Sequence, residues 1–220
     1  MISRKGDISM TKDNNNGFTL IEILVALALT GIVMGAIYSA YHSQQKTYIM
    51  QESIAEMQQN LRAAMYLMTQ EIRMAGYDPR GTAGAGIETA NPAEIKFTKD
   101  LDADGTIDSG NSEEITYSLY TADGIQKLGR KNPTQNMPVA LNIDALNFVY
   151  LDEDDIVTAT ASDIRSVQIT IVARTGRSDP NYNNTFQYYN LQDTSIFGPA
   201  NDGFHRRALS TQVKCRNLGL

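Results

Sequence analysis

The stretch Gly17–Tyr41, GFTLIEILVALALTGIVMGAIYSAY, decides the architecture of this 220-residue chain. Apart from Glu22, no residue of this stretch carries a charge. About 20 apolar residues in a helix are enough to cross a bilayer, so residues 18–41 are predicted to form a transmembrane helix. An ionised carboxylate inside such a helix is costly unless a positive group meets it. Glu22 therefore needs a partner.

The polar segment before this stretch, residues 1–17, predicts how the helix is oriented and processed. It carries three basic side chains against two acidic ones, and the positive-inside bias would keep it in the cytoplasm, with the body of the protein outside. A secretory signal peptide has its cleavage site after the apolar region, whereas Gly17 precedes it. Cleavage after Gly17 would remove a leader and leave the helix on the mature chain. Whether Met1 or Met10 is the true start stays open.

Residues 42–76 are predicted to continue the same helix in amphipathic form. Between polar positions, apolar side chains recur every three or four residues. Gly76 followed by Pro79 is a stop signal, so one helix is expected over residues 18–75. The apolar stripe consists of Ile54, Met57, Leu61, Met65, Met68, Ile72 and Ala75.

The remaining residues, 77–220, are predicted to form one β-rich outer domain in the periplasm. Alternating apolar residues and turn signals indicate short strands. A polar stretch from Ser178 to Gly203 is too long for a hairpin turn. The expected fold class is α+β, with a long N-terminal helix packed on an antiparallel sheet. The predicted strands are Glu94–Thr98, Glu114–Tyr120, Ala145–Leu151, Asp163–Arg174 and Arg206–Cys215.

Composition excludes several functions. The formal net charge is −6, and it becomes −7 without the leader, which argues against nucleic-acid binding because phosphate contacts need clustered Lys and Arg. The lone cysteine, Cys215, allows no intrachain disulfide and is expected to be a buried strand residue. The two histidines, His42 and His205, belong to no catalytic motif, so the chain is not expected to be an enzyme.

An aspartate-rich segment is the sharpest candidate for a ligand site. Alternate carboxylates that end in Gly105 resemble the spacing of calcium loops, in which glycine allows a sharp turn. The twelfth position is Asn111 instead of glutamate, so Glu113 or Glu114 would have to substitute. The alternative is an Asp/Gly-rich turn solvated by water. The candidate Ca²⁺ ligands are Asp100, Asp102, Asp104, Thr106, Asp108, Glu113 and Glu114.

Within the apolar stretch, Gly31 and Gly35 form a Gly-x-x-x-Gly pair. Such a pair provides a small face for close helix contact, or a point where the helix loosens in an assembly. Glycine is also common in membrane-spanning helices, and both interpretations stay open.

The hexapeptide Gly17-Phe18-Thr19-Leu20-Ile21-Glu22 resembles the processing motif of class III signal peptides. This motif is found in type IV pilins and in the pseudopilins of type II secretion. The resemblance implies that a prepilin peptidase cuts after Gly17 and methylates the new N-terminus, Phe18. It also implies a partner for Glu22, the α-amino group of a neighbouring subunit's first residue in the filament.

Later segments are similar to the PilW type of minor pilin, which is related to the J-type minor pseudopilin of type II secretion. They are Arg73–Pro79, the Asp-rich loop that runs into Glu114–Leu119, and Leu209–Asn217. The similarity implies a subunit that primes or caps a type IV pilus, together with other minor and major pilins and the inner-membrane assembly platform. Such a subunit would be stored in the lipid of the bacterial inner membrane, with its C-terminal domain outside the cytoplasm, and would later join the filament or its tip.

Two alternative functions stay open. The first is a minor pseudopilin of a type II secretion system. The second is a pilus-tip adhesin whose outer loop, Asn181–Phe204, recognises a ligand, since Tyr182, Phe186, Tyr188 and Tyr189 would form an aromatic patch or would pin that loop to the core.

Overall fold

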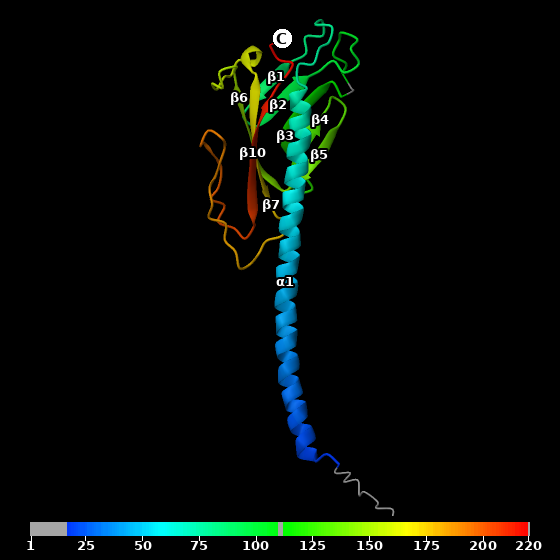
Figure 1. Ribbon diagram of the computed structural model, residues 1–220, viewed down its shortest axis with the longest axis vertical. Helices are drawn as coiled ribbons and strands as arrows, with labels where there is room; N and C mark the ends of the chain where they lie inside the picture. Colours follow the sequence, from blue (N-terminus) through cyan, green and yellow to red (C-terminus); the bar gives the residue numbers. More distant parts are fainter. Residues whose placement is uncertain (1–16, 110–111, 220) are drawn as a thin grey trace, which may run out of the picture. The chain divides into compact units, whose positions relative to one another are not determined.

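The computed structural model describes residues 17–109 and 112–219 (Figure 1). The predicted leader, apart from Gly17, lies outside these residues, as does Asn111. The chain divides into two compact units, Met1–Tyr48 and Ile49–Leu220. A single helix, α1 (Leu20–Arg73), contributes to both, which confirms the predicted helix to within two residues at each end.

The first unit contains α1 up to Tyr48. Every residue from Gly17 to Tyr48 is exposed, including the large apolar side chains of the predicted transmembrane segment. By length and composition, α1 is the one helix among the described residues that is apolar enough to cross a membrane. No side chain from Gly17 to Tyr48 is buried, so helix formation here depends on local interactions and on the surrounding medium.

The second unit begins with the amphipathic part of α1. Its buried positions are spaced three or four residues apart, as the apolar stripe predicts. The helix ends at Arg73, and Gly76 adopts a left-handed conformation (φ 76°) that suits glycine at a helix C-terminus. The Gly76 N–H donates to Thr98 O at 3.0 Å, which ties the end of α1 to a strand. The buried residues are Ser53, Met57, Leu61, Ala64, Met65, Met68 and Ile72.

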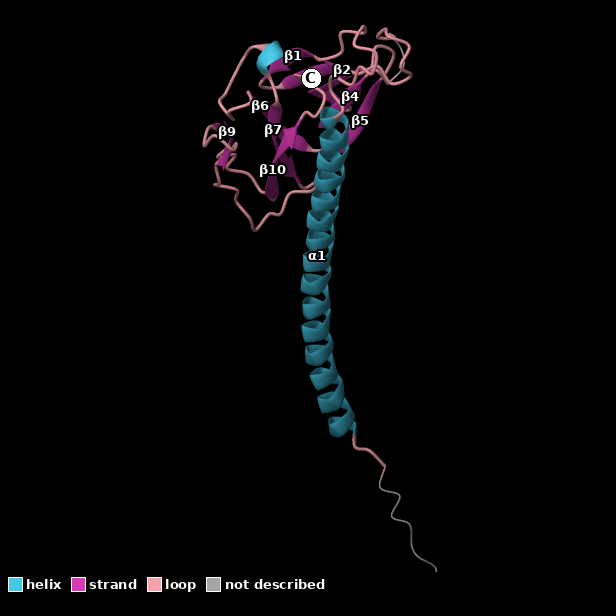
Figure 2. Ribbon diagram, turned by 45° about the horizontal axis from the view of Figure 1, so that its top comes forward, coloured by secondary structure: helices cyan, strands magenta, loops and turns pink. Residues whose placement is uncertain are grey.

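A five-stranded antiparallel meander follows α1, and its strands neighbour one another in chain order (Figures 1 and 2). Fully buried side chains alternate along the second strand, at Ile95 and Phe97, and along the third, at Ile115 and Tyr117, as a sheet with one face in the core requires. The strands are β1 (Ile87–Asn91), β2 (Glu94–Thr98), β3 (Glu114–Ala122), β4 (Ile125–Lys131) and β5 (Asn136–Leu141).

A second, three-stranded antiparallel sheet has the order β10-β7-β6. It consists of β6 (Ile143–Leu151), β7 (Ser166–Arg174) and β10 (Arg206–Lys214). The central strand β7 is buried at every position except Arg174. A short 3₁₀ helix (Ala161–Asp163) precedes it, so the strand predicted from Asp163 starts three residues later.

The polar stretch predicted as a loop contains a two-stranded hairpin, β8 (Tyr188–Tyr189) and β9 (Ser195–Phe197). The α+β class is confirmed, although the single predicted sheet is two sheets and this hairpin. One core joins the buried face of α1 to residues of both larger sheets, such as Phe97 and Phe148. Strands β1, β4 and β5 were not predicted, because these segments lack a clear apolar alternation.

Candidate functional site

The start of α1 forms a capping box around Glu22. The backbone N–H and the hydroxyl of Thr19 donate to Glu22 Oε2 at 2.9 and 2.8 Å, and the Glu22 N–H donates back to Thr19 Oγ1 at 3.3 Å. This reciprocal arrangement satisfies helix-start donors, and a negative charge is favourable at a helix N-terminus. Glu22 therefore has a neutral partner in its own chain. The Thr-x-x-Glu spacing is the sequence signal, which the prediction had not used.

Apolar side chains surround the Glu22 carboxylate on the helix surface. Two shallow depressions meet at this residue. A helix that packed against this surface would remove water from the carboxylate while making apolar contacts. The lining residues are Phe18, Glu22, Ile23, Ala26, Leu27 and Thr30 on one flank and Ile21, Val25 and Leu29 on the other.

Gly31 and Gly35 lie on one exposed face of α1, four residues apart. A Cβ built on either glycine meets no described atom within 4 Å. Neither glycine is needed for packing within the described chain, and their role in close helix contact stays a prediction. Gly17 and Phe18 precede the helix and are exposed, so the predicted processing site is accessible.

A buried polar contact joins α1 to the five-stranded sheet. Arg130 of β4 donates from Nε and Nη2 to the Glu71 carboxylate at 2.8–3.0 Å, and the Tyr117 hydroxyl of β3 donates to the same carboxylate at 2.5 Å. The hydrogen bonds to Glu71 raise the pKa of Arg130, and burial raises the pKa of Tyr117, an effect that the Glu71 charge reinforces. Sequence reasoning missed this contact, because its partners lie 46 and 59 residues away from Glu71.

The aspartate-rich segment forms the loop between β2 and β3, and it brings most of the predicted ligands together. One carboxylate oxygen from each of Asp100, Asp102 and Glu113 lies within 4.8 Å of the other two. Asp102, Asp104 and Asp108 form a second such group, so Asp102 belongs to both. The first group combines two buried carboxylates with an exposed one, and the second group is exposed throughout.

Two predicted ligands of this loop have other partners. Glu114 forms an ion pair with Lys96 at 3.1 Å, and Lys96 also contacts Glu88 at 2.7 Å, so Glu114 points into the sheet's surface network instead of the acidic group. The Thr106 hydroxyl donates to Asp104 Oδ1 at 2.7 Å, which orients that carboxylate. Of the two glutamates proposed as substitutes for the twelfth position, it is Glu113 that joins the group.

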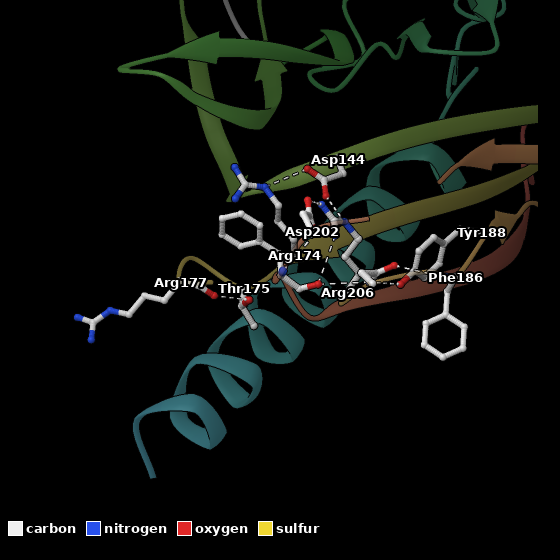
Figure 3. A network of polar contacts seen from close by, with 10 residues as sticks. Asp144, Arg174, Thr175, Arg177, Phe186, Tyr188, Asp202 and Arg206 are labelled. Carbon is white, nitrogen blue, oxygen red and sulfur yellow. Dashed lines mark hydrogen bonds and ion pairs between the residues drawn. The ribbon is translucent and has the colours of Figure 1, made fainter. Parts of the chain in front are cut away.

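A second charged network holds the long segment between β7 and β10. Asp144 of β6 lies between Arg174 Nε at 3.0 Å and Arg206 Nε at 2.6 Å, and Arg206 also contacts Asp202 (Figure 3). Burial opposes the charge of Arg206, but its hydrogen bonds to Asp202 and Asp144 outweigh that effect and raise its pKa. The hydrogen bond from Arg206 in turn lowers the pKa of Asp202.

Aromatic residues of the same segment divide into half-buried and exposed ones. The Tyr182 ring stacks on His205 with centroids 3.9 Å apart, and Tyr188 accepts a hydrogen bond from Asn184 at 3.0 Å. Phe186 and Tyr189 are 61% and 50% exposed. Half of the expected aromatic patch therefore pins the segment, and the other half faces solvent.

Cys215 directly follows β10 and is 2% exposed; burial raises the pKa of its thiol to about 12. This placement fits a packed, unreactive cysteine. His42 stacks on Tyr38 of the exposed helix, whereas His205 contacts Asp179 at 3.3 Å. The prediction that the chain is not an enzyme stays a prediction.

The exposed apolar helix, its capped Glu22 and the α+β domain define a type IV pilin-like protein. Residues 12–38 match the family model described as the prokaryotic N-terminal methylation motif. Residues 50–191 match the model of prepilin peptidase-dependent protein B, and the chain belongs to that family. The methylation motif implies processing by a prepilin peptidase and assembly with other pilins. Motif and helix together fit a membrane-anchored pilin that later joins a filament.

Among solved structures, the chain is similar to the type IV-like pilin TTHA1219 from Thermus thermophilus, with 14% sequence identity and a TM-score of 0.47. The match covers 73% of this chain and 97% of that chain. This similarity is too distant to transfer residues or functions. No curated protein sequence matches the chain, and assignment to the PilW type stays a prediction.

Proposed function

We propose that this protein is a minor pilin, a low-abundance subunit that primes or caps a type IV pilus with other minor and major pilins. The observation that best supports this proposal concerns the first half of α1. It is apolar, exposed on all sides and interrupted by a single carboxylate, Glu22. Such a helix is stable only in an apolar environment. Before assembly this environment is the lipid of the inner membrane, and in the filament it is the helices of neighbouring subunits.

Glu22 provides the specificity of this packing. Its Oε2 atom is engaged by Thr19, whereas no described residue donates to Oε1. When a neighbouring helix covers the apolar surface around Glu22, the carboxylate loses water and needs a positive partner. The α-amino group of Phe18 in an adjacent subunit, created when the peptidase removes the leader, is that partner. Apolar contacts alone would allow neighbouring helices to pack at many axial positions with similar energy. The charge pair selects the one position at which Glu22 meets the α-amino group.

The test of this mechanism is the variant Glu22→Gln in the native host, with Glu52→Gln as the matched control on an exposed part of the same helix. We expect the amount of Glu22→Gln in sheared filaments, measured by immunoblot against total protein, to fall at least about tenfold, because the charge pair is lost. Glu52→Gln should enter filaments normally. Normal incorporation of Glu22→Gln contradicts the pairing.

Priming is tested separately by deleting the gene and counting filaments per cell by electron microscopy. We expect few filaments in the deletion strain, recovery with the wild-type chain and no recovery with Glu22→Gln. Mass spectrometry of the wild-type protein should show an N-terminal methylated Phe18. Loss of protein secretion with normal pili would instead assign the chain to a type II secretion system.

A tip adhesin is the second candidate, and the exposed Phe186 and Tyr189 favour it. They lie on a segment that the Asp144 network holds in place, which would give a binding surface of defined shape (Figure 3). If deletion leaves filament number normal but abolishes attachment, and Phe186→Ser with Tyr189→Ser reproduces that loss, adhesion replaces priming.

A further inference from the structure

The loop between β2 and β3 buries two carboxylates that form no ion pair with a described residue. Asp100 is 0% exposed and Glu113 is 1% exposed, and each offers an oxygen to the group that also contains Asp102. Buried ionised groups are stable only when they are paired, hydrogen-bonded or bound to a metal. Among the ion pairs of the described residues, none includes a carboxylate of this group or of Asp104 and Asp108.

The two buried carboxylates differ in how they are satisfied. Glu113 accepts backbone N–H groups with both oxygens, from Leu101 at 2.8 Å and Asp108 at 2.8 Å. Asp100 accepts the Gly105 N–H with Oδ2 at 3.0 Å, but its buried Oδ1 has no hydrogen-bond partner among the described residues. An unsatisfied buried acceptor is unfavourable, and an anionic one especially so. Asp100 Oδ1 is therefore an atom to which a bound cation could supply the contact that the described residues do not.

Nearby basic side chains do not fill this position. Arg80 donates to the backbone carbonyl of Asp104 at 2.8 Å. Lys99 is buried and forms no ion pair with a described residue. The described carboxylates of the loop therefore lie close together without an ion pair to any described basic side chain.

We propose that this loop binds one calcium ion, held by the carboxylates of Asp100, Asp102 and Glu113, with Asp104 and Asp108 on the solvent side. The donor set consists of carboxylate oxygens without His or Cys, which is the chemistry of hard divalent cations. Calcium suits it better than magnesium, because calcium accepts many carboxylate ligands in an irregular geometry, whereas magnesium demands an octahedron and keeps several waters.

Binding there would cross-link two segments of the second unit. The Asp100 N–H donates to Tyr77 O at 2.7 Å, and the Thr82 hydroxyl donates to Gly105 O at 3.3 Å. The loop therefore contacts the segment that follows α1, and the cation would stabilise the C-terminal end of that helix together with the β2–β3 connection. The site is independent of the proposed assembly role of Glu22.

The experiment uses the full chain in detergent, stripped of metal with EDTA and titrated with CaCl₂ by calorimetry. We expect one equivalent of calcium with a dissociation constant of about 0.1–1 mM, typical of extracellular sites. At about one hundred times that concentration, calcium should raise the Tm of the second unit by roughly 5–10 °C relative to EDTA. MgCl₂ at the same concentration should raise it much less.

Asp100→Asn and Glu113→Gln should abolish both the heat and the calcium-dependent shift in Tm, whereas Asp154→Asn, in the acidic turn after β6, should leave both unchanged. If the buried variants do not fold, the exposed Asp102→Asn and Asp108→Asn should weaken calcium binding about tenfold or more. Three results overturn the proposal: no calcium heat from the wild-type chain, a shift retained in all ligand variants, or an equal shift with magnesium.

Discussion

Two glutamates of the same helix, Glu22 and Glu71, show how differently the two units use a charge. Glu22 is exposed and its contacts are with Thr19, three residues away. Glu71 is mostly buried and its partners, Tyr117 and Arg130, come from strands far along the chain. The first glutamate stabilises a helix start, and the second joins the helix to a sheet. The second unit therefore pairs its charge within its own fold, whereas the first half of α1 presents Glu22 on an exposed surface.

Among changes to charged residues, the largest effect on stability is expected from Glu71→Gln. The change leaves the Arg130 guanidinium largely buried with a neutral partner, which should lower the free energy of unfolding by about 3 kcal/mol. The Tm of the full chain in detergent should fall by roughly 6–12 °C, measured by tyrosine circular dichroism. Glu22→Gln should leave that Tm unchanged. Equal effects of the two variants would remove the distinction between the glutamates.

The apolar side chains of the two units offer a second comparison. Met68→Ala, at a position that is 0% exposed, should destabilise the second unit by about 2–4 kcal/mol through a cavity in the core. Met34→Ala, at a position that is 63% exposed, should not change thermal unfolding. Denaturant titration measures the free energy of unfolding of each variant, and a thermal scan measures its Tm. A destabilising Met34→Ala would show that the first unit is packed within the isolated chain.

A smaller effect is expected for acid stability. Because Arg206 lowers the pKa of Asp202 in the folded chain, this carboxylate stabilises the fold above its ordinary pKa of 3.8, and the contribution is lost as pH falls through the lower folded value. The pair is partly exposed, so the fall in Tm between pH 7 and pH 3 should be about 1–3 °C smaller in Asp202→Asn than in the wild type. The conservative variant Asp202→Glu, with a carboxylate retained, should keep the wild-type acid sensitivity.

The smallest effect on global stability is expected from Thr19→Ala, which removes the capping box. Backbone amides of the first helical turn should exchange with deuterium about fivefold faster, while the Tm of the second unit stays the same. Thr30→Ala, whose hydroxyl donates to Ala26 O within the same helix, is the matched control. Unchanged exchange at Leu20–Ile23 would contradict the role of Thr19 as a cap.

Local patterns predicted the parts of the fold that local physics controls. The helix was predicted along nearly its whole length, because an apolar run, an amphipathic repeat and Gly76 define its course and its end. Strands β2 and β7 were predicted because alternating or continuous apolar residues set their period. Strand β5, NMPVAL, was missed because most of its residues are exposed and it is ordered by pairing with β4.

The candidate sites show the same division. The positions of Gly17, Phe18 and Glu22 are readable because their motif is contiguous, and the acidic loop is readable because its aspartates alternate. The choice between Glu113 and Glu114 could not be read from the sequence. These neighbours point to opposite faces at the start of β3, and only the fold shows which face contains Asp100.

By itself, the sequence determined that this is a pilin-like chain with a long helix, apolar in its first half, and a β-rich domain, because these properties follow from short-range patterns of apolar and charged residues. Tertiary structure alone decided that the domain has two sheets and that Glu71 meets Arg130. These contacts join residues dozens of positions apart, and their energy arises only when the packed core removes both partners from water.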